Sequence, residues 1–350
     1  MTHPSASPAA WPHVAEVHRG MTFGFYARNG YYGSPEARAQ VDKMAALNIK
    51  WVCLVATVLQ ETYASGRQFR DFKMTPADDE LRDIIDYVHT KGMKVQLRPM
   101  LECWDGTQRI HITFPGDTLI MPGKPVTHAS RWFESMTERT LHYARLATRG
   151  GCEAYGLDSE IDLITHFNAE WKQVVAAARS VFKGHLTSSH TQHVDFLKDP
   201  QRPDHWFRDL DSLGTSFYTP VSDRPGATVD EMVAHLAPAL EQHRRIAALY
   251  GKPFYFGEAG CCATAGATRK PWGWDNPGGY DGAEQANFLE ALLRTFWNEP
   301  WWMGLYWWKW DEQNDRPQFR DDPRGDKGFT LDGKPAAQIL KTWYARTDRP

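Results

Sequence analysis

The segment KWVCLVA (residues 50–56) is a short apolar run with β-branched and aromatic residues, which is typical of a buried strand. A helical pattern follows over residues 76–91, opened by Thr75 and Pro76 and ended by Gly92. A second strand pattern, KVQLRP (residues 94–99), comes directly after this helix. A strand, a helix and a strand in this order predict a βαβ unit with parallel strands.

The same alternation runs through the rest of the chain. Strands are predicted over residues 21–26, 50–56, 94–99, 153–157, 184–188, 212–217, 253–257 and 302–307. Helices are predicted over residues 34–47, 76–91, 131–148, 168–182, 204–210, 228–250, 281–297 and 335–344. Eight strands, each followed by helical sequence, predict an α/β fold, a (β/α)₈ TIM barrel.

We interpret residues 21–350 as a single barrel domain, preceded by an N-terminal arm of residues 1–20. Long loops are expected after the third and the seventh strand, where glycines and prolines gather. The alternative architecture is an open, doubly wound sheet. Its usual GxGxxG signal after the first strand is absent from this sequence.

Composition excludes several classes of protein. The chain has 350 residues, of which 42% are hydrophobic and 13% aromatic, so it can bury a large core. A net charge of −3 without a basic run favours no nucleic-acid partner, and the apolar runs are too short to span a membrane. The first twenty residues lack a signal-peptide pattern, so we expect a cytoplasmic protein, while a secreted mature form stays open. The oligomeric state stays open as well.

Function in such a barrel lies at the carboxyl ends of the strands. Carboxylates, aromatic rings and hydrogen-bonding groups gather there, together with many of the chain's fifteen Trp residues. Flat aromatic faces of this kind commonly stack against ligands, and sugars are the ligands we expect. The candidate ligand-binding residues are Tyr26, Arg98, Glu102, Trp104, Ser159, His190, Tyr218, Trp274, Trp308 and Trp310.

Two carboxylates stand out among the strand ends, Glu160 and Glu258. Glycoside hydrolysis needs one acid to protonate the leaving oxygen and a second carboxylate that attacks the sugar or activates water. Each glutamate alone could equally form a structural salt bridge at a strand end. Asp158, two residues before Glu160, is a further candidate for the acid.

Several short motifs, taken in their order, resemble glycoside hydrolase family 113, a family of (β/α)₈ retaining enzymes. The resemblance extends over residues 22–312 and rests on fragments that are individually short. These fragments are GSPEA (33–37), TPAD (75–78), GMKV (92–95), RP (98–99), SEI (159–161), EW (170–171), GHLT (184–187), KPF (252–254), EAG (258–260), EQ (284–285) and GLYWWKW (304–310).

The resemblance implies that Glu160 is the acid/base and Glu258 the nucleophile. It also implies that Tyr218 hydrogen-bonds the nucleophile and that Trp308 forms the floor of the sugar site. The implied substrate is a β-1,4-mannan or a manno-oligosaccharide, and neither a metal nor an organic cofactor is implied.

Two positions depart from the pattern of the family and its clan. Ser159 stands where the clan often has an asparagine before the acid/base, and Met100 stands where the family tends to have a histidine. These departures keep open a β-glycosidase of another specificity, acting on β-glucosides or amino-sugar chains. A non-catalytic sugar-binding barrel and a metal-dependent barrel hydrolase stay open too. A metal site would need His190 and His193 to find a third ligand.

Overall fold

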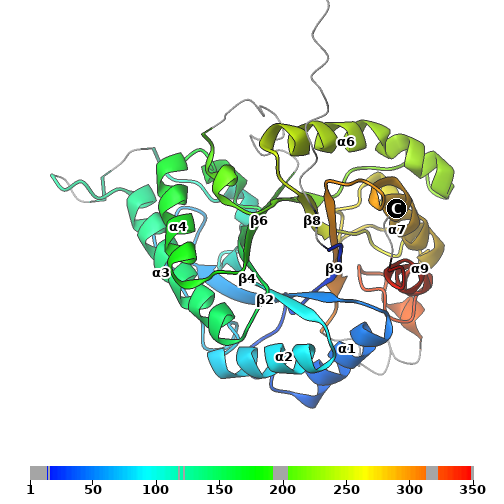
Figure 1. Cartoon of the computed structure of the whole chain (residues 1–350), viewed down its shortest axis with the longest axis horizontal. Coiled ribbons are helices and arrows are strands. Elements are labelled where there is room, and N and C mark those ends of the chain that lie inside the picture. The colour runs from blue at the N-terminus through cyan, green and yellow to red at the C-terminus, as the bar shows by residue number, and fades with distance from the viewer. Residues whose placement is uncertain are drawn as a thin grey trace, which may run out of the picture.

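The computed structural model describes residues 14, 16–116, 119–120, 123–191, 204–312 and 322–347. Eight parallel strands close into a barrel in the order β1, β2, β4, β5, β6, β7, β8 and β9, with β9 pairing back to β1. A short strand, β3, pairs antiparallel with the end of β2. Figure 1 shows the ring of strands enclosed by helices, with α3 and α4 on one side and α7 and α9 on the other. The predicted (β/α)₈ barrel is confirmed.

The strands are β1 (His18–Phe23), β2 (Trp51–Gln60), β3 (Gln68–Phe69), β4 (Lys94–Cys103), β5 (Ala154–Ser159), β6 (His185–Thr191), β7 (Leu213–Phe217), β8 (Phe254–Ala259) and β9 (Trp302–Trp310). The helices are α1 (Pro35–Ala46), α2 (Asp78–Thr90), α3 (His128–Arg149), α4 (Asn168–Val181), α6 (Val229–Tyr250), α7 (Gly282–Phe296) and α9 (Pro335–Tyr344). Single 3₁₀ turns cover Arg109–His111, Asp162–Ile164, Trp206–Asp209, Ala267–Arg269 and Pro323–Gly325.

Side chains alternate between the inside and the outside of the barrel, as the pleat of a strand requires. In β2, Cys53 packs with Tyr255 and Tyr306 in one buried cluster, whereas the neighbouring Leu54 joins the large core shared with the helices. A third cluster contains Val55, Met100 and Trp308. The inside of the barrel is therefore a packed core with its own layers, and not a pore.

Several strand predictions ended at the wrong residue. The first strand occupies His18–Phe23, not residues 21–26, so it begins within the segment predicted as an arm. The last strand continues past residue 307 to Trp310, and β2 and β4 pair in continuous register from Trp51 and Lys94 to Gln60 and Cys103. Local apolar patterns end earlier than these strands because the pairing itself carries polar residues into the sheet.

The second helix begins at Asp78, and Thr75 does not cap it. Instead the Glu80 carboxylate accepts a 2.6 Å hydrogen bond from the Ala77 N–H, and the Thr75 hydroxyl accepts one from Asp71 N–H. The short helix predicted over residues 204–210 is a 3₁₀ turn, Trp206–Asp209. Among the described residues no helix is both long and apolar enough to cross a membrane. All five cysteines are buried and unpaired.

Candidate active site

Three barrel strands bring charged and polar side chains to one end of the barrel. Arg98 and Glu102 come from β4, Ser159 ends β5 and is followed by Glu160, and Glu258 lies in β8. The parallel pairing of β5 with β6 shifts register between Gly156 and Ser159, and that of β7 with β8 shifts between Thr215 and Ser216. Such irregularities re-aim side chains next to functional sites.

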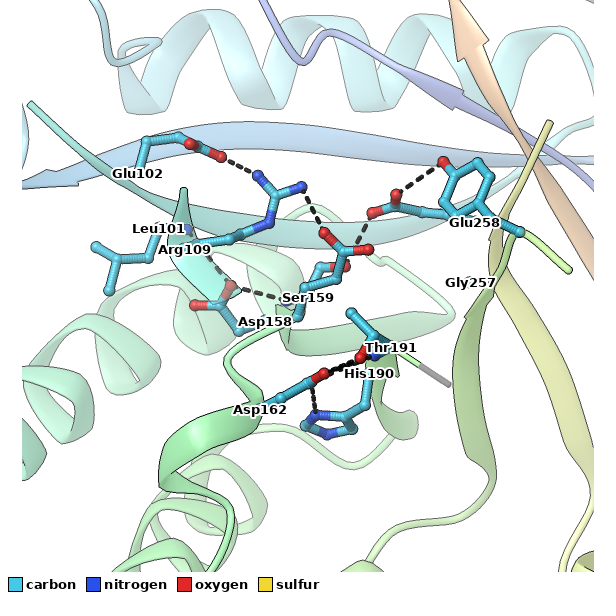
Figure 2. A network of polar contacts seen from close by, with 12 residues as sticks. Leu101, Glu102, Arg109, Asp158, Ser159, Asp162, His190, Thr191, Gly257 and Glu258 are labelled. Carbon is cyan, nitrogen blue, oxygen red and sulfur yellow. Dashed lines mark hydrogen bonds and ion pairs between the residues drawn. The ribbon is translucent and has the colours of Figure 1, made fainter. Parts of the chain in front are cut away.

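The carboxylate of Glu258 is buried and held on both oxygens. The Ser159 hydroxyl donates to Oε1 at 2.8 Å, and the Tyr218 hydroxyl donates to Oε2 at 3.1 Å. The Arg98 guanidinium lies 3.7 Å from Oε1 and also donates to the Gly257 carbonyl at 3.1 Å. Figure 2 shows the Ser159 hydroxyl directed at Glu258. Two hydroxyl donors and a nearby cation fix the orientation of this carboxylate.

Glu160 differs from Glu258 in its surroundings. Its backbone φ is +59°, a left-handed conformation that costs a non-glycine residue about 1–3 kcal/mol, and this kind of strain clusters at functional sites. Burial and the charge of Glu258 raise the pKa of Glu160 to about 7, and the Arg109 cation opposes this rise. Two carboxyls whose surroundings differ in this way are suited to opposite acid and base roles.

Arg109 connects Glu160 to Glu102. Its Nη2 lies 3.3 Å from Glu160 Oε2, and its Nη1 donates to Glu102 Oε1. Figure 2 shows the Arg109 guanidinium beside Glu102. Arg109 was not predicted from the sequence, because it belongs to a 3₁₀ turn in the long loop after the third barrel strand. No sequence pattern of a strand end marks such a position.

The contacts of Asp158 indicate a structural role and not an acid/base role. Its carboxylate forms an ion pair with Arg139 of α3 and accepts hydrogen bonds from the N–H groups of Ser159, at 2.7 Å, and Leu101, at 3.4 Å. Both side chains of the Asp158–Arg139 pair are nearly inaccessible to solvent. Asp158 is therefore engaged with the barrel wall and α3, which leaves Glu160 as the carboxyl that faces Glu258.

Two predicted sugar-binding residues do not join this cluster. His190 is buried, with its ring against Phe207 at 4.9 Å and Trp206 at 5.8 Å, and its Nδ1 lies 3.4 Å from Asp162. In Figure 2 His190 and Asp162 form a separate group from Glu258. Trp310 is also buried, and its indole N–H donates to Gln40 at 2.8 Å. The alternation of strand side chains turns His190 toward the outside of the barrel, and Trp310 faces outward where the register of β1 with β9 shifts, so both places fit packing and not sugar contact.

The aromatic candidates form a buried floor and an exposed rim. Trp308 packs with Met100 and Val55, and its ring meets Phe25 edge-on at 4.9 Å. Tyr26 and Trp104 are each 61% exposed, and Trp274 is 76% exposed. Tyr26 does not belong to a strand but to the turn after β1. Exposed aromatic rings in loops at the carboxyl end of the barrel suit a ligand with flat apolar faces.

A buried ion pair supports Tyr26. The Lys309 ammonium lies 3.1 Å from Glu312 Oε2 and 4.7 Å from the centre of the Tyr26 ring. Glu312 Oε1 accepts a hydrogen bond from the Tyr26 N–H at 3.0 Å. Neither Lys309 nor Glu312 was predicted as a site residue. Tyr26 and Glu312 are 286 positions apart in the chain, and a contact over that separation leaves no local signal.

No group of three or more His, Cys, Asp or Glu side chains that could hold a metal occurs within the described ranges. His193 lies outside the described residues, so the predicted His190 and His193 pair is not characterised.

The sequence model of glycoside hydrolase family 113 matches residues 21–334. The chain belongs to glycoside hydrolase family 113. This family 113 enzyme is a glycoside hydrolase with the predicted barrel fold. None of the curated proteins compared with the chain matches it.

Solved structures resemble the family 113 enzyme over nearly its whole length. A family 113 β-mannanase from Alicyclobacillus acidocaldarius is 28% identical, with a TM-score of 0.82, and the match covers 94% of this chain and 97% of the other. Another family 113 β-1,4-mannanase is 26% identical, with a TM-score of 0.79 and coverage of 95% and 100%. A family 5 mannosidase from Rhizomucor miehei, 12% identical with a TM-score of 0.61 and coverage of 94% and 92%, shares the fold.

Proposed function

We propose that this glycoside hydrolase cleaves β-1,4-linked mannan or manno-oligosaccharides with retention of anomeric configuration. The observation that carries the proposal is the unequal carboxyl pair. Glu258 accepts hydrogen bonds from Ser159 and Tyr218 that orient it, while burial and the charge of Glu258 raise the pKa of Glu160 to about 7. Double displacement requires these two groups, a proton donor and an oriented carboxylate beside it.

In the first step, protonated Glu160 gives its proton to the glycosidic oxygen as the bond to the anomeric carbon breaks. A carboxylate oxygen of Glu258 attacks the anomeric carbon from the opposite face and forms a glycosyl ester. The hydroxyls of Ser159 and Tyr218 orient the attacking carboxylate. In the second step, ionised Glu160 takes a proton from water, the water oxygen attacks the anomeric carbon, and Glu258 leaves. Retention predicts that the two carboxyl groups lie about 5–5.5 Å apart.

The choice of mannan rests on the family and on the solved relatives, which are β-mannanases. Met100 packs against Trp308, at a position where the family tends to have a histidine. This position therefore offers no polar ring to the sugar. The Ser159 hydroxyl donates its hydrogen bond to Glu258. These two positions support the second candidate, a retaining β-glycosidase for another β-linked hexose or amino sugar, because both change the groups available to the sugar while both carboxyls are kept.

A hydrolysis screen tests the proposal. Manno-, cello- and chito-oligosaccharides with β-1,4 linkages and aryl β-glycosides are incubated with wild type and with Glu258→Gln. We expect release from manno-oligosaccharides that the variant loses. Release from another sugar alone would refute the mannan assignment and favour the second candidate. Oligosaccharide binding without release, unchanged in Glu258→Gln, would refute the hydrolytic mechanism.

A further inference from the structure

Arg109 is fixed on several sides at the edge of the carboxyl pair. Its Nη2 lies 3.3 Å from Glu160 Oε2, its Nη1 donates to Glu102 Oε1, and its guanidinium carbon lies 5.5 Å from the centre of the Phe25 ring. The residue is only 8% exposed. A guanidinium that is buried, stacked and paired with two carboxylates has little freedom to turn. Its distance to Glu160 is therefore set by the fold.

We propose that Arg109 is a positioning residue that holds the Glu160 carboxylate and favours its ionised form, and that Glu102 limits the strength of this hold. The inference rests on the proposed acid/base role of Glu160. It adds a residue that does not touch the glycosidic bond in our mechanism, and it explains how one carboxyl serves as an acid and then as a base.

Charges from several elements act on Glu160. Burial is the largest influence, and it raises the pKa of Glu160. Glu258 of β8 and Asp162 also raise this pKa, whereas the cation of Arg109 and the hydroxyl of Ser216 lower it. The other groups around the two carboxyls are Glu102 and Arg98 of β4, Tyr218 after β7, and the buried pair Asp158–Arg139.

Glu258 loses its negative charge when it becomes a glycosyl ester. One cause of the raised pKa of Glu160 then disappears, while the Arg109 cation stays. The balance moves toward ionised Glu160 at the stage where the mechanism requires a base. Arg109 thus supplies a constant influence, and Glu258 supplies the one that changes during the reaction.

Glu102 shares the same guanidinium. Burial raises the pKa of Glu102, and the Arg109 cation opposes that rise, so both carboxylates compete for one positive charge. Removal of the Glu102 charge would leave Glu160 as the charged partner of the Arg109 guanidinium. Loss of the Arg109 cation and loss of the Glu102 charge are therefore predicted to change the protonation of Glu160 in opposite directions.

The test compares Arg109→Met, Glu102→Gln and the conservative Arg109→Lys. The pH dependence of kcat/KM is measured from about pH 4 to 9 with mannopentaose, or with the oligosaccharide that wild type cleaves in the screen. The basic limb reports loss of the Glu160 proton in the free enzyme. In Arg109→Met we expect this limb to move up by about 1 pH unit or more, because an adjacent opposite charge commonly changes a pKa by about 1–3. In Glu102→Gln we expect it to move down.

The same variants predict a change in the rate-limiting step. With Glu160 less ionised in the glycosyl ester, Arg109→Met slows the second step, and the loss approaches tenfold for each unit that the pKa of Glu160 rises only at pH values well below that pKa. An activated aryl glycoside should then show a burst of phenol release. Arg109→Lys keeps the charge and should return the basic limb toward that of wild type.

A purely structural role would lower activity in both variants and leave the basic limb at the same pH. The proposal would be overturned if the basic limb of both variants stayed at the wild-type pH, or if it moved in the same direction in Arg109→Met and Glu102→Gln. Glu102→Gln keeps the test decisive if Arg109→Met unfolds, which thermal denaturation shows. Glu160→Ala tests the proposed function separately: azide should restore its activity on an aryl glycoside, and failure of this rescue would count against the acid/base assignment and not against Arg109 alone.

Discussion

Neutralisation of Glu258 should lower the pKa of Glu160. Glu258→Gln removes the negative charge that, after burial, is the second cause of the raised pKa of about 7. A like charge within about 4–6 Å commonly raises a carboxyl pKa by about 1–3, which corresponds to about 1.4–4 kcal/mol. Burial remains in the variant, and so does the opposing Arg109 cation. We therefore expect the pKa of Glu160 to fall by about 1–2.

Carbon NMR measures this change directly. Protein labelled with ¹³C at the glutamate carboxyl is titrated from about pH 3 to 9, and the Glu160 resonance is assigned by its absence from Glu160→Gln. Glu241→Gln is the matched control, since it removes a carboxylate from the exposed side of α6. A Glu160 pKa that stays unchanged in Glu258→Gln would refute the electrostatic coupling of the two carboxyls. An equal fall in Glu241→Gln would refute its specificity.

Three further changes test other parts of the site. Tyr218→Phe removes a 3.1 Å hydrogen bond to the proposed nucleophile, and because a hydrogen bond to a charged group contributes about 1.5–3 kcal/mol, kcat/KM should fall about 10- to 100-fold; an unchanged value would contradict the contact. Arg139→Met leaves the Asp158 carboxylate buried without its cation, so urea unfolding should show a loss of about 3–5 kcal/mol, partly recovered in the double variant with Asp158→Asn. Trp104→Ala and Trp274→Ala should change the free energy of unfolding by less than about 0.5 kcal/mol but raise KM for long oligosaccharides, and an unchanged KM would exclude these rings from ligand binding.

The architecture could be predicted because its signals are local. Apolar strands, capped helices and their strict alternation follow from nearby residues, and the eight barrel strands appear where such patterns occur. Strand ends were less predictable. The pairing of Gln60 with Cys103 extends two strands beyond their apolar cores, and no local pattern indicates that a neighbouring strand continues equally far.

The sequence predicted which residues lie at the strand ends, but it predicted the direction of their side chains only where the strands are regular. Ser159, Glu160, Tyr218 and Glu258 meet because their strands end at the same rim. Trp310, two residues beyond Trp308, was predicted to bind the sugar, yet its indole N–H donates to Gln40 of α1. The register of β1 with β9 shifts where Phe23 pairs with Trp310, and no sequence pattern reveals this irregularity.

Arg109 and Glu312 could not be predicted for a different reason. Each contacts a partner that only the folded loops bring near, Arg109 contacting Glu160 and Glu312 contacting Tyr26. A charged residue in a loop is usually solvated, so its type gives no indication of burial. Only the folded chain shows that these charges face the site.

Trapping of the glycosyl ester tests the central claim, that Glu258 attacks the sugar. The enzyme is incubated with a 2-deoxy-2-fluoro-β-mannosyl fluoride, whose fluorine slows the second step, and is then digested and analysed by mass spectrometry. We predict one added sugar on the peptide that carries Glu258, and none in Glu258→Gln. A label on another carboxylate, or the α-anomer as the first product of hydrolysis seen by proton NMR, would contradict the account.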